Sequence, residues 1–298
     1  MGILNFGSLN IDKVYKVSHF VKPGETIAAK SYSCFPGGKG LNQSVAVAKA
    51  GEKIFHAGTI GNDGEFLREI LKESGADDRY LRTSDTVTGN AIIQVADNGE
   101  NCIILFSGSN LENTKEYIDE VLIHFGENDI LLLQNEISNL DYLLLRASEK
   151  RMRVMLNPSP INEDIKKMDL SGVTWLILNE VEGEELTGEN VPEKILEVLS
   201  KKYSCKEIIL TLGKKGSMHY ENGVVNRQEC ITVKTVDTTA AGDTFTGYFL
   251  AMVSKNVEAK VALEIASYAS AIAVGRAGAS VSIPFMEEVE MIRSEKNN

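Results

Sequence analysis

The sequence predicts an α/β fold: a doubly wound, mostly parallel β-sheet covered by helices on both faces, with a small β-sheet lid. Three observations support this fold class. From about residue 114 onward, short apolar runs alternate with amphipathic stretches of helical length. Before that point, strand-like segments follow one another with no helical stretch directly beside them. The 298 residues are 43% hydrophobic and 24% charged, which is typical of a globular chain that buries a large core.

The early strand-like segments predict the lid. The Asn98-Gly99 pair between two of them favours a hairpin turn. We expect a small antiparallel sheet that projects from the main body, with lid strands from about 10–36 and 88–107 inserted in a single domain of residues 1–298. The segments with a strand pattern are the opening strand 3–8 and the segments 26–34, 88–97 and 102–106.

The later apolar runs predict the main sheet. Each run is short and has no polar face, and helix-length stretches separate one run from the next. This pattern is typical of parallel strands that are buried on both sides, and ligands bind beyond the carboxyl ends of such strands. The runs are residues 130–133, 154–156, 175–178 and 208–212, and apolar residues recur at helical spacing over 262–273.

Charge and cysteine content argue against several classes of protein. The formal net charge is −11 and no long Lys/Arg run is present, which disfavours nucleic-acid binding. The four cysteines lie far apart without a CxxC pair, so we expect neither a metal-ligand set nor a disulfide framework. No apolar run reaches about 18 residues, and no signal-peptide pattern is present. We therefore expect a cytoplasmic protein with no membrane or nucleic-acid partner.

The strongest functional signal is the segment 237–243, DTTAAGD. It follows a β-type stretch at 231–236 and precedes an apolar helix at 244–253. Its middle residues have minimal side chains, so their N–H groups lie open at a helix N-terminus and form a site for negative charge. The residues that would form this site are Ala240, Ala241 and Gly242.

Asp243 lies in the first helical turn beside this anion site. Amides there can hold the charge of a transferring phosphoryl group while a carboxylate accepts the proton of the attacking hydroxyl. The alternative is that Asp237 or Thr239 caps the helix and Asp243 only complements its dipole. Two aspartates around a turn of small residues are more than a cap requires, which favours the catalytic interpretation.

A second motif, GGKGLNQS, occupies residues 37–44. Its glycines allow a ligand to approach the backbone, and Lys39 and Asn42 can form hydrogen bonds with hydroxyl groups. A glycine-rich loop alone is usually a turn before a helix. Its occurrence together with the 237–243 motif gives it weight.

These two motifs resemble the signatures of the ribokinase (PfkB) family of carbohydrate kinases, and the similarity runs over nearly the whole chain. Gly51 and Gly61 follow at the family's spacing. Tyr248 departs from the small residue that is usual there, which we expect to alter packing rather than chemistry. The resemblance implies a ribokinase-like fold, ATP as phosphoryl donor, Mg²⁺, and Asp243 as catalytic base.

The resemblance also implies a sugar site. Asn10 and Asp12 follow the first strand, where the family places ligands of sugar hydroxyls, and Glu136 falls at a strand end. Taken alone, Asn10 and Asp12 would be read as a turn, and Glu136 as a solvated loop acid. The implied substrate-binding set is Asn10, Asp12, Gly38, Lys39, Gly40, Asn42, Glu136 and Asp243.

The implied nucleotide site draws on three further segments. Asn179 and Glu182 match the family's N-x-x-E element, which orders Mg²⁺ and phosphate, although Asn179 can also be a plain helix cap. No P-loop motif is present. Ser267 stands where an Asn near the adenine is common, which leaves nucleotide selectivity open. The implied nucleotide-binding set is Asn179, Glu182, Thr211, Gly213, Gly216, Gly242 and Ser267.

A loop near the C-terminus resembles the family's site for a monovalent cation. A K⁺ ion bound there would brace the anion-site turn without touching the substrate. The implied cation-binding set is Asp237, Thr239, Ala273, Arg276, Gly278 and Ser282.

We therefore expect ATP-dependent phosphorylation of the primary hydroxyl of a sugar, with ribose to ribose 5-phosphate as the first candidate. Another small sugar or a nucleoside (fructose, 2-keto-3-deoxygluconate, adenosine) remains an alternative. A non-catalytic sugar or nucleotide sensor is an alternative of another class, which loss of Asp243 would mark. The resemblance further implies a homodimer formed through the lid.

Overall fold

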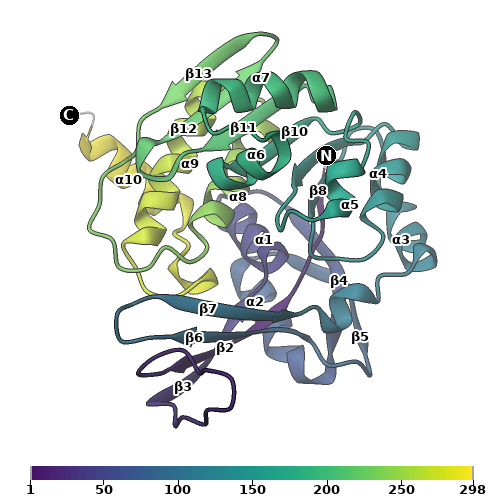
Figure 1. Cartoon of the computed structure of the whole chain (residues 1–298). Helices are drawn as coiled ribbons and strands as arrows, with labels where there is room; N and C mark the ends of the chain where they lie inside the picture. Colours follow the sequence, from purple (N-terminus) through teal and green to yellow (C-terminus); the bar gives the residue numbers. More distant parts are fainter. Residues whose placement is uncertain (1, 297–298) are drawn as a thin grey trace.

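The computed structural model describes residues 2–296, and the main sheet follows the predicted pattern (Figure 1). The prediction of one domain over 1–298 also includes Met1 and residues 297–298, which lie outside this range. Nine strands of the described chain form the sheet. Their order is β13 (Val224–Gln228), β12 (Ser217–Glu221), β11 (Glu207–Thr211), β10 (Trp175–Asn179), β9 (Arg153–Asn157), β8 (Ile130–Gln134), β1 (Ile3–Phe6), β4 (Ile54–Gly61) and β5 (Asp77–Ser84).

Neighbouring strands from β11 to β5 pair in parallel, and β12 and β13 add an antiparallel edge. Side chains alternate between two buried faces. On β8, Ile130 and Leu132 pack into one apolar cluster while Leu131 and Leu133 pack into the other. This two-sided burial explains why the predicted runs lack polar residues, and it confirms the predicted fold class.

Helices cover both faces of the sheet. One cluster contains side chains of α1 (Lys39–Lys49), α2 (Glu65–Ser74), α8 (Ala241–Ser254), α9 (Ala259–Val274) and α10 (Met286–Lys296). The other contains side chains of α3 (Lys115–Leu122), α4 (Leu140–Glu149), α5 (Glu163–Lys167), α6 (Glu180–Thr187) and α7 (Pro192–Tyr203). Within residues 2–296, none of these helices combines the length and the apolar character needed to cross a bilayer.

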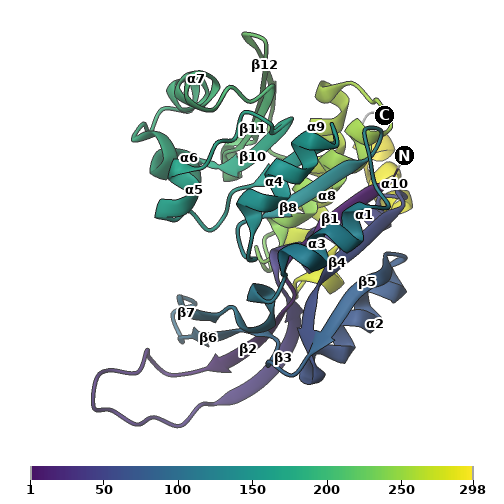
Figure 2. The same ribbon diagram turned by 90° about the vertical axis from the view of Figure 1, so that its right-hand side faces the viewer.

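The lid is a separate four-stranded sheet that extends away from the main body (Figure 2). Its order is β3 (Ser31–Gly37), β2 (Asn10–Lys16), β6 (Gly89–Val95) and β7 (Asn101–Phe106). The expectation of an antiparallel sheet is corrected, because β2 and β6 pair in parallel. Strand β2 follows β1 of the main sheet and β6 follows β5, so both lid strands leave the main sheet in the same direction.

Two local predictions also differ from the structure. Residues 231–236 form an irregular loop rather than a strand, although their β-branched residues favour a strand. The strand predicted at 26–34 begins only at Ser31, and residues 26–30 before it are irregular. In both places the chain has no neighbouring strand to pair with, so intrinsic preference alone does not produce one.

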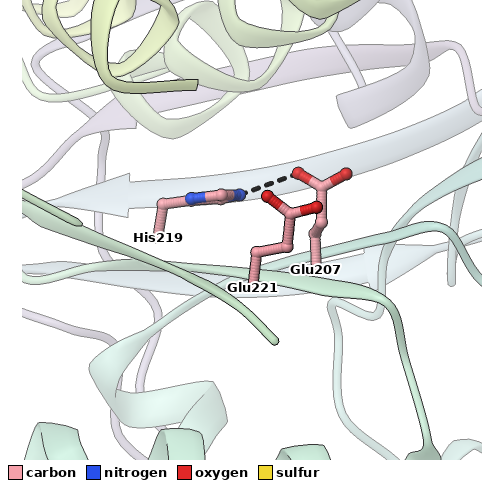
Figure 3. A group of neighbouring side chains, drawn as sticks. All are labelled: Glu207, His219 and Glu221. Atoms are coloured by element: carbon pink, nitrogen blue, oxygen red, sulfur yellow. Dashed lines mark hydrogen bonds and ion pairs between the residues drawn. The ribbon is translucent and has the colours of Figure 1, made fainter. Parts of the chain in front are cut away.

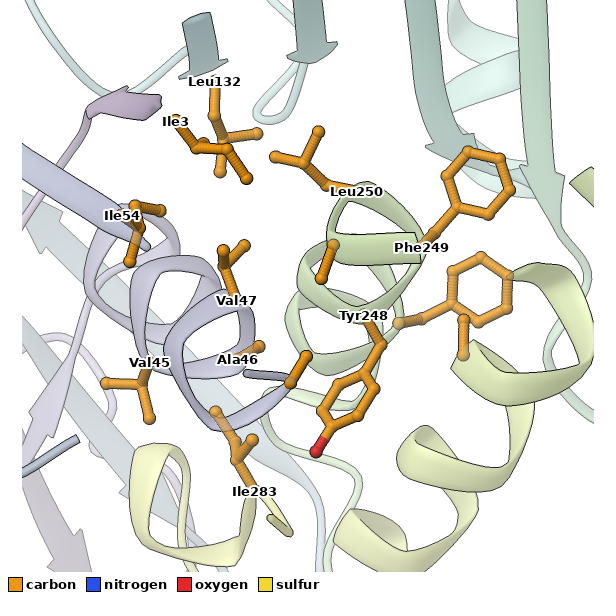
Figure 4. Packing of buried hydrophobic residues seen from close by; sticks show 14 of the residues in the cluster. Ile3, Val45, Ala46, Val47, Ile54, Leu132, Tyr248, Phe249, Leu250 and Ile283 are labelled. Atoms are coloured by element: carbon orange, nitrogen blue, oxygen red, sulfur yellow. The ribbon is translucent and has the colours of Figure 1, made fainter. Parts of the chain in front are cut away.

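Helices α1 and α8, which carry the two sequence motifs, pack directly on each other (Figure 4). Gly247 permits this contact, because a methyl group there would lie 2.4 Å from the Ala46 Cβ. Tyr248 is fully buried beside this contact, and its hydroxyl donates to the Pro284 carbonyl at 2.8 Å. The packing brings residues about 200 positions apart in the sequence to one site.

Candidate active site

The small-residue turn before α8 has a left-handed residue at its centre. Ala240 has φ 59° and ψ 9°, and its carbonyl accepts the N–H of Thr244 at 2.8 Å. The Ala241 N–H donates to the Thr238 carbonyl at 3.2 Å. Within the described chain, the N–H groups of Gly242 and Asp243 have no hydrogen-bond acceptor. The Ala240 N–H likewise has no acceptor there, so of the three predicted donors only that of Ala241 is used within the turn, and Asp243 adds an open N–H at the start of the α8 dipole.

The Asp243 carboxylate is buried and is held from two directions. Asn42 donates its Nδ2 to Oδ2 at 3.0 Å, and Gln43 donates its Nε2 to Oδ1 at 2.9 Å. Both donors lie in the first turns of α1. Each carboxylate oxygen thus has one protein donor, and its remaining lone pair can accept a proton from a substrate hydroxyl.

The glycines of the first motif bring α1 close to the first strand. Gly38 has φ 94°, a left-handed conformation that favours glycine. A methyl group on Gly40 would lie 2.3 Å from the Ser8 N, so only glycine fits there. These contacts set α1 against the end of β1, with Lys39 and Asn42 beside Asp243.

Two more carboxyl groups share this end of the sheet. Glu136 Oε2 accepts the Ser8 hydroxyl at 2.5 Å and the Lys39 N–H at 3.2 Å. Burial, followed by Glu136 and Asp243, raises the pKa of Asp12 to about 7. Burial also raises the pKa of Glu136, although Lys39 opposes this change. Desolvation is the larger cause for both groups, as expected for carboxyl groups in a closed polar site.

Lys39 is the positive charge among these acids. Burial alone would lower the pKa of its ammonium group, but Asp243, Glu136 and Glu182 outweigh burial and raise it. Asn10, the first residue of β2, is also buried, and its Oδ1 accepts the Asn110 Nδ2 at 2.8 Å. The structure therefore gathers the predicted sugar residues of β2, α1 and α8 at one end of the sheet.

Two adjoining cavities lie at this end of the sheet, and the smaller one reaches Asp243. The smaller has a volume of about 250 Å³ and includes Lys39, Asn179, Glu182 and Asp243 in its lining. The larger has a volume of about 710 Å³ and is mostly apolar. Four residues line both cavities, so the two spaces meet at the turn before α8: Thr211, Thr238, Ala241 and Gly242.

The larger cavity has the composition of a site for a nucleotide base. Ile231, Val233, Phe245 and Val274 supply apolar surface, as is common in small-molecule sites. The remaining predicted nucleotide residues also line it: Gly213, Gly216 and Ser267. A nucleotide whose base lies here would extend its phosphates toward Gly242.

Asn179 and Glu182 form a capping box at the start of α6. Asn179 Oδ1 accepts the Glu182 N–H at 2.9 Å, and Glu182 Oε2 accepts the Asn179 N–H at 2.9 Å. Both side chains nevertheless line the smaller cavity. The helix cap is therefore present, and it leaves both side chains in a position where they could also serve the predicted role toward Mg²⁺ and phosphate. An oxygen-rich pair of this kind fits Mg²⁺, which keeps several of its waters.

The predicted cation loop is only partly assembled around Asp237. Asp237 Oδ1 accepts the Thr239 N–H and hydroxyl at 2.9 and 2.7 Å, and Oδ2 accepts the Gly278 N–H at 3.1 Å. These bonds outweigh burial and lower the pKa of Asp237. The side chains of Arg276 and Ser282 have other partners, namely Glu288 and the Ala279 carbonyl. The Ala273 carbonyl accepts the Arg276 N–H at 3.0 Å.

Several polar residues of the site were not singled out from the sequence. Gln43 holds Asp243 directly, yet it appeared only as a letter of the second motif. Asn157 ends the buried strand β9 and lines the smaller cavity, together with Thr246 of α8. A rule that selects the first polar residue after each buried parallel strand would have found Asn157.

A further group of titratable side chains, Glu207, His219 and Glu221, lies outside this site (Figure 3). His219 is fully buried, and its Nε2 forms a 2.7 Å hydrogen bond with Glu207 Oε2. Glu207 begins β11, whereas the cavity residue Thr211 ends it. At about 3.3 Å per residue, the two positions are about 13 Å apart. The hydrogen bond satisfies the buried imidazole, so we regard this group as structural.

Known proteins share both this sequence and this geometry. Residues 2–286 match the sequence model described as pfkB family carbohydrate kinase. A ribokinase of Haemophilus influenzae is 34% identical over 292 residues, which cover 95% of each chain. The crystal structure of a ribokinase from Thermotoga maritima is 38% identical, covers 98% of this chain and 99% of its own, and superposes with a TM-score of 0.85. A structure of Arabidopsis thaliana ribokinase complexed with ribose and ATP covers 97% of both chains at 28% identity, with a TM-score of 0.87. The chain belongs to the pfkB family of carbohydrate kinases.

Proposed function

We propose that the chain transfers the γ-phosphoryl group of ATP to the primary hydroxyl of ribose, giving ribose 5-phosphate and ADP. The observation that carries this proposal is the position of Asp243. Its carboxylate is fixed by Asn42 and Gln43, and it lines a polar cavity that adjoins the large apolar one. The relatives named ribokinase, and the solved ribokinase with ribose and ATP, support ribose as the acceptor.

In the proposed reaction, the 5-oxygen of ribose forms a bond to the γ-phosphorus of ATP, and Asp243 accepts the proton that this hydroxyl group loses. The bond from that phosphorus to the bridging oxygen breaks, and ADP leaves with the electron pair. The transition state places charge on the phosphoryl oxygens, which fixed N–H donors stabilise. The open N–H groups of Gly242 and Asp243 are suited to this task, and the Lys39 ammonium can add positive charge.

The remaining polar groups would orient the sugar. Asp12, Asn42 and Glu136 offer acceptors or donors for hydroxyl groups around the point where the 5-hydroxyl meets Asp243. Gly38 and Gly40 allow the sugar to approach the backbone of the first motif. Correct placement of the hydroxyl next to the phosphorus is itself a large part of the rate acceleration.

Two ions complete the proposed site. Mg²⁺ would be held near Glu182 and Asn179, partly through water, and would neutralise charge on the ATP phosphates. A K⁺ ion would bind next to Asp237, using carbonyl oxygens of the loop that includes Gly278. Activity of the wild type should then rise on adding K⁺, and Asp237→Ala should lose this activation while retaining a basal rate. Turnover with KCl against a salt of a larger organic cation measures the effect.

The lid would close over the sugar and exclude water, which limits hydrolysis of ATP. We also propose that the lid forms a homodimer contact. Its strands carry apolar side chains that are exposed in the single chain, among them Ile103 and Ile104 of β7 with 54% and 59% exposure. Three exposed thiols without a disulfide, together with the use of ATP, fit a location in the reducing cytoplasm.

A panel of acceptors tests the substrate. Ribose, fructose, 2-keto-3-deoxygluconate and adenosine would each be incubated with ATP and Mg²⁺, with ADP release and product structure recorded. We expect the largest kcat/KM for ribose, with phosphate on the 5-oxygen. A larger value for fructose or adenosine would overturn the choice of sugar but keep the reaction class. Binding of sugar and ATP without any turnover would indicate a sensor.

A further inference from the structure

A buried chain of amide side chains lies behind Asp243 and joins it to the centre of the sheet. Its members come from two neighbouring strands and from α1: Asn5 of β1, Gln134 of β8 and Gln43 of α1. All three residues are fully buried. Burying polar side chains costs free energy unless they are hydrogen-bonded, so three buried amides next to Asp243 must be judged by their partners.

The links are continuous. Gln43 Nε2 donates to Asp243 Oδ1 at 2.9 Å, and Gln43 Oε1 accepts Gln134 Nε2 at 2.8 Å. Gln134 Nε2 also donates to Asn5 Oδ1 at 3.1 Å. Asn5 Nδ2 in turn donates to the Gly40 carbonyl and to Ser44 Oγ, both at 2.8 Å.

The chain has a fixed direction because one end is a backbone carbonyl. The Gly40 carbonyl can only accept, so Asn5 must turn its NH₂ group toward Gly40 and its Oδ1 toward Gln134. Gln134 must then present its NH₂ group to both Asn5 and Gln43. This leaves Gln43 with its oxygen toward Gln134 and its NH₂ group toward Asp243. A rotated Gln43 would instead place an oxygen against the carboxylate.

One oxygen in this series of amides is unpaired, as the direction of the hydrogen bonds requires. Gln134 Oε1 is buried and has no hydrogen-bond partner in the described chain. Such an atom costs on the order of 1–3 kcal/mol, and rotating the Gln134 amide would not recover this cost without setting oxygen against oxygen. Gly7 also makes room for it, since a methyl group there would lie 2.7 Å from Gln134 Oε1.

The far end of the chain carries no charge. Ser44 Oγ lies 2.8 Å from the Nδ1 of His56, a fully buried imidazole. Burial lowers the pKa of His56 to about 4, so this ring is neutral near pH 7. The chain therefore brings oriented dipoles to Asp243, while the charges that face the carboxylate are those of Lys39, Asp12 and Glu136.

We propose that Asn5, Gln134 and Gln43 form a positioning relay, which fixes the rotation of the Gln43 amide so that it always donates to Asp243 and aims this carboxylate at the sugar hydroxyl. Gln43 is then a positioning residue that acts through Asp243. The proposal rests on the function proposed above. Asn42, a predicted sugar-binding residue, holds the other carboxylate oxygen, whereas the relay reaches Asp243 through fully buried side chains.

Gln43→Met tests the relay by removing the donor while keeping the length of the side chain. We expect kcat with ribose and ATP to fall about 10- to 100-fold, as for the loss of one hydrogen bond to a charged group, with the KM for ATP within about twofold of wild type. Asn113→Leu is the matched control. Asn113 is also buried, and its amide bonds to Thr59 and the Asn110 carbonyl, but within residues 2–296 no hydrogen bond of its side chain leads to Gln43 or Asp243. This control should lower the melting temperature and leave kcat within about twofold.

Two substitutions at Gln134 separate the effect of the orientation of the Gln43 amide from the effect of altered packing at Gln134. Gln134→Met leaves Gln43 free to donate to Asp243, so kcat should fall only a few-fold. Gln134→Glu has nearly the same shape and, when ionised, can only accept; kcat measured up to high pH, where the carboxyl group is ionised, then tests a group that draws the Gln43 NH₂ group away and turns its oxygen toward Asp243. We expect a loss of kcat at least as large as that of Gln43→Met. A purely structural role predicts instead that kcat follows the melting temperature in both variants.

The outcomes distinguish this proposal from the one on which it rests. If Asp243→Ala abolishes turnover but Gln43→Met keeps kcat within twofold of wild type, the relay is wrong and the function stands. Equal kcat for Gln134→Met and Gln134→Glu would also overturn the relay, even if Gln43→Met failed to fold. If Asp243→Ala retains turnover, both proposals fall, because the relay acts only through that carboxylate.

Discussion

Three carboxyl groups and one ammonium group share the polar end of the site, and their environments differ. Asp243 has donors on both oxygens, Glu136 accepts from Ser8 and Lys39, and Asp12 lies against the backbone of Gly37. A methyl group on Gly37 would lie 2.2 Å from Asp12 Oδ2, so this glycine makes space for the carboxyl group. Burial and the neighbouring carboxyl groups Glu136 and Asp243 raise the pKa of Asp12 to about 7.

Asp12→Asn should change stability in a pH-dependent way. The raised pKa of Asp12 favours the folded state at low pH, and this contribution is lost as pH rises from about 4 to about 7. Asparagine does not ionise, so the variant avoids the cost of burying a charged carboxylate at high pH. Its free energy of unfolding should exceed that of wild type by on the order of 2 kcal/mol at pH 8 and by little at pH 4. The figure is below the full linkage value because the carboxyl group is only half-buried.

Urea unfolding of the ligand-free proteins at both pH values measures this difference. The same variant should raise the KM for ribose at least about tenfold, through the loss of an ionised acceptor. A difference in unfolding free energy that is the same at pH 4 and pH 8 would contradict the assignment for Asp12.

At the residue scale, sequence reasoning found the charged residues around Asp243 but missed Asn157 and Thr246 of the cavity lining and the amide side chains behind the carboxylate. Asp243, Asn42 and Lys39 stand in motifs whose chemistry is readable from residue type and order. Gln43 and Gln134 have their roles only because α1, β8 and α8 meet in space, and no local pattern encodes that meeting. The Ala241 N–H was expected to be open, but the turn uses it, since hydrogen bonding within a turn depends on its dihedral angles.

At the scale of elements, the contact of α1 with α8 fixes the distance between the two motifs. Helix α8 is buried on nearly all sides, and Gly247 lies where its backbone approaches α1 too closely for a larger residue. A methyl group there would lie 2.4 Å from Ala46 Cβ and 2.9 Å from the Gln43 carbonyl. Neither neighbour is the end of a flexible chain, so the helices themselves would have to separate.

Gly247→Ala should therefore lower both stability and activity. Forcing a methyl group into a packed contact costs about 1–3 kcal/mol, and the shift of α8 would move Asp243 relative to Asn42 and the sugar. We expect a lower melting temperature and a kcat reduced by at least about tenfold. Gly126→Ala is the control, because a methyl group there meets nothing within 4 Å. An unchanged kcat in Gly247→Ala would show that the helix contact does not set the geometry of the site.

The elements predicted best are those with two independent signals. The strands of the main sheet combine apolar runs with flanking helices, and α9 shows clear helical spacing; both kinds were found near their observed positions. The lid was harder to predict, because its strands are exposed on at least one face and carry few periodic signals. Strand β2 begins with Asn10 and includes Asp12, residues that favour turns, yet pairing with β3 and β6 holds them extended.

At the scale of the whole molecule, the exposed lid is the feature that a single chain leaves unexplained. Ile103 and Ile104 are adjacent on β7, so they point to opposite faces of the lid. One face can cover the sugar while the other meets a second lid. A lid that pairs with a partner buries apolar surface that would otherwise remain exposed.

The variants Ile103→Asp and Ile104→Asp test this arrangement one face at a time. Wild type should have the mass of a homodimer in size-exclusion chromatography with light scattering, and at least one variant should shift to a monomer, since a buried charge disfavours the contact. Val224→Asp is the control, because Val224 is equally exposed at the far edge of the main sheet. A wild type that is monomeric at all concentrations would contradict the proposed dimer.

The dimer is the feature of the whole molecule that is hardest to predict from one sequence. The fold, the order of the motifs and their meeting at the carboxyl ends of the strands follow from patterns within one sequence. Which face of the lid binds a second chain depends on a surface that the pattern of one chain does not specify.

The most direct measurement is the steady-state turnover of ribose and ATP by Asp243→Ala, alongside its binding of ADP. Removal of the base should reduce kcat by about 10³-fold, while the dissociation constant for ADP stays within a few-fold of wild type. Turnover within a few-fold of wild type would contradict the assignment of Asp243 as the group that accepts the hydroxyl proton.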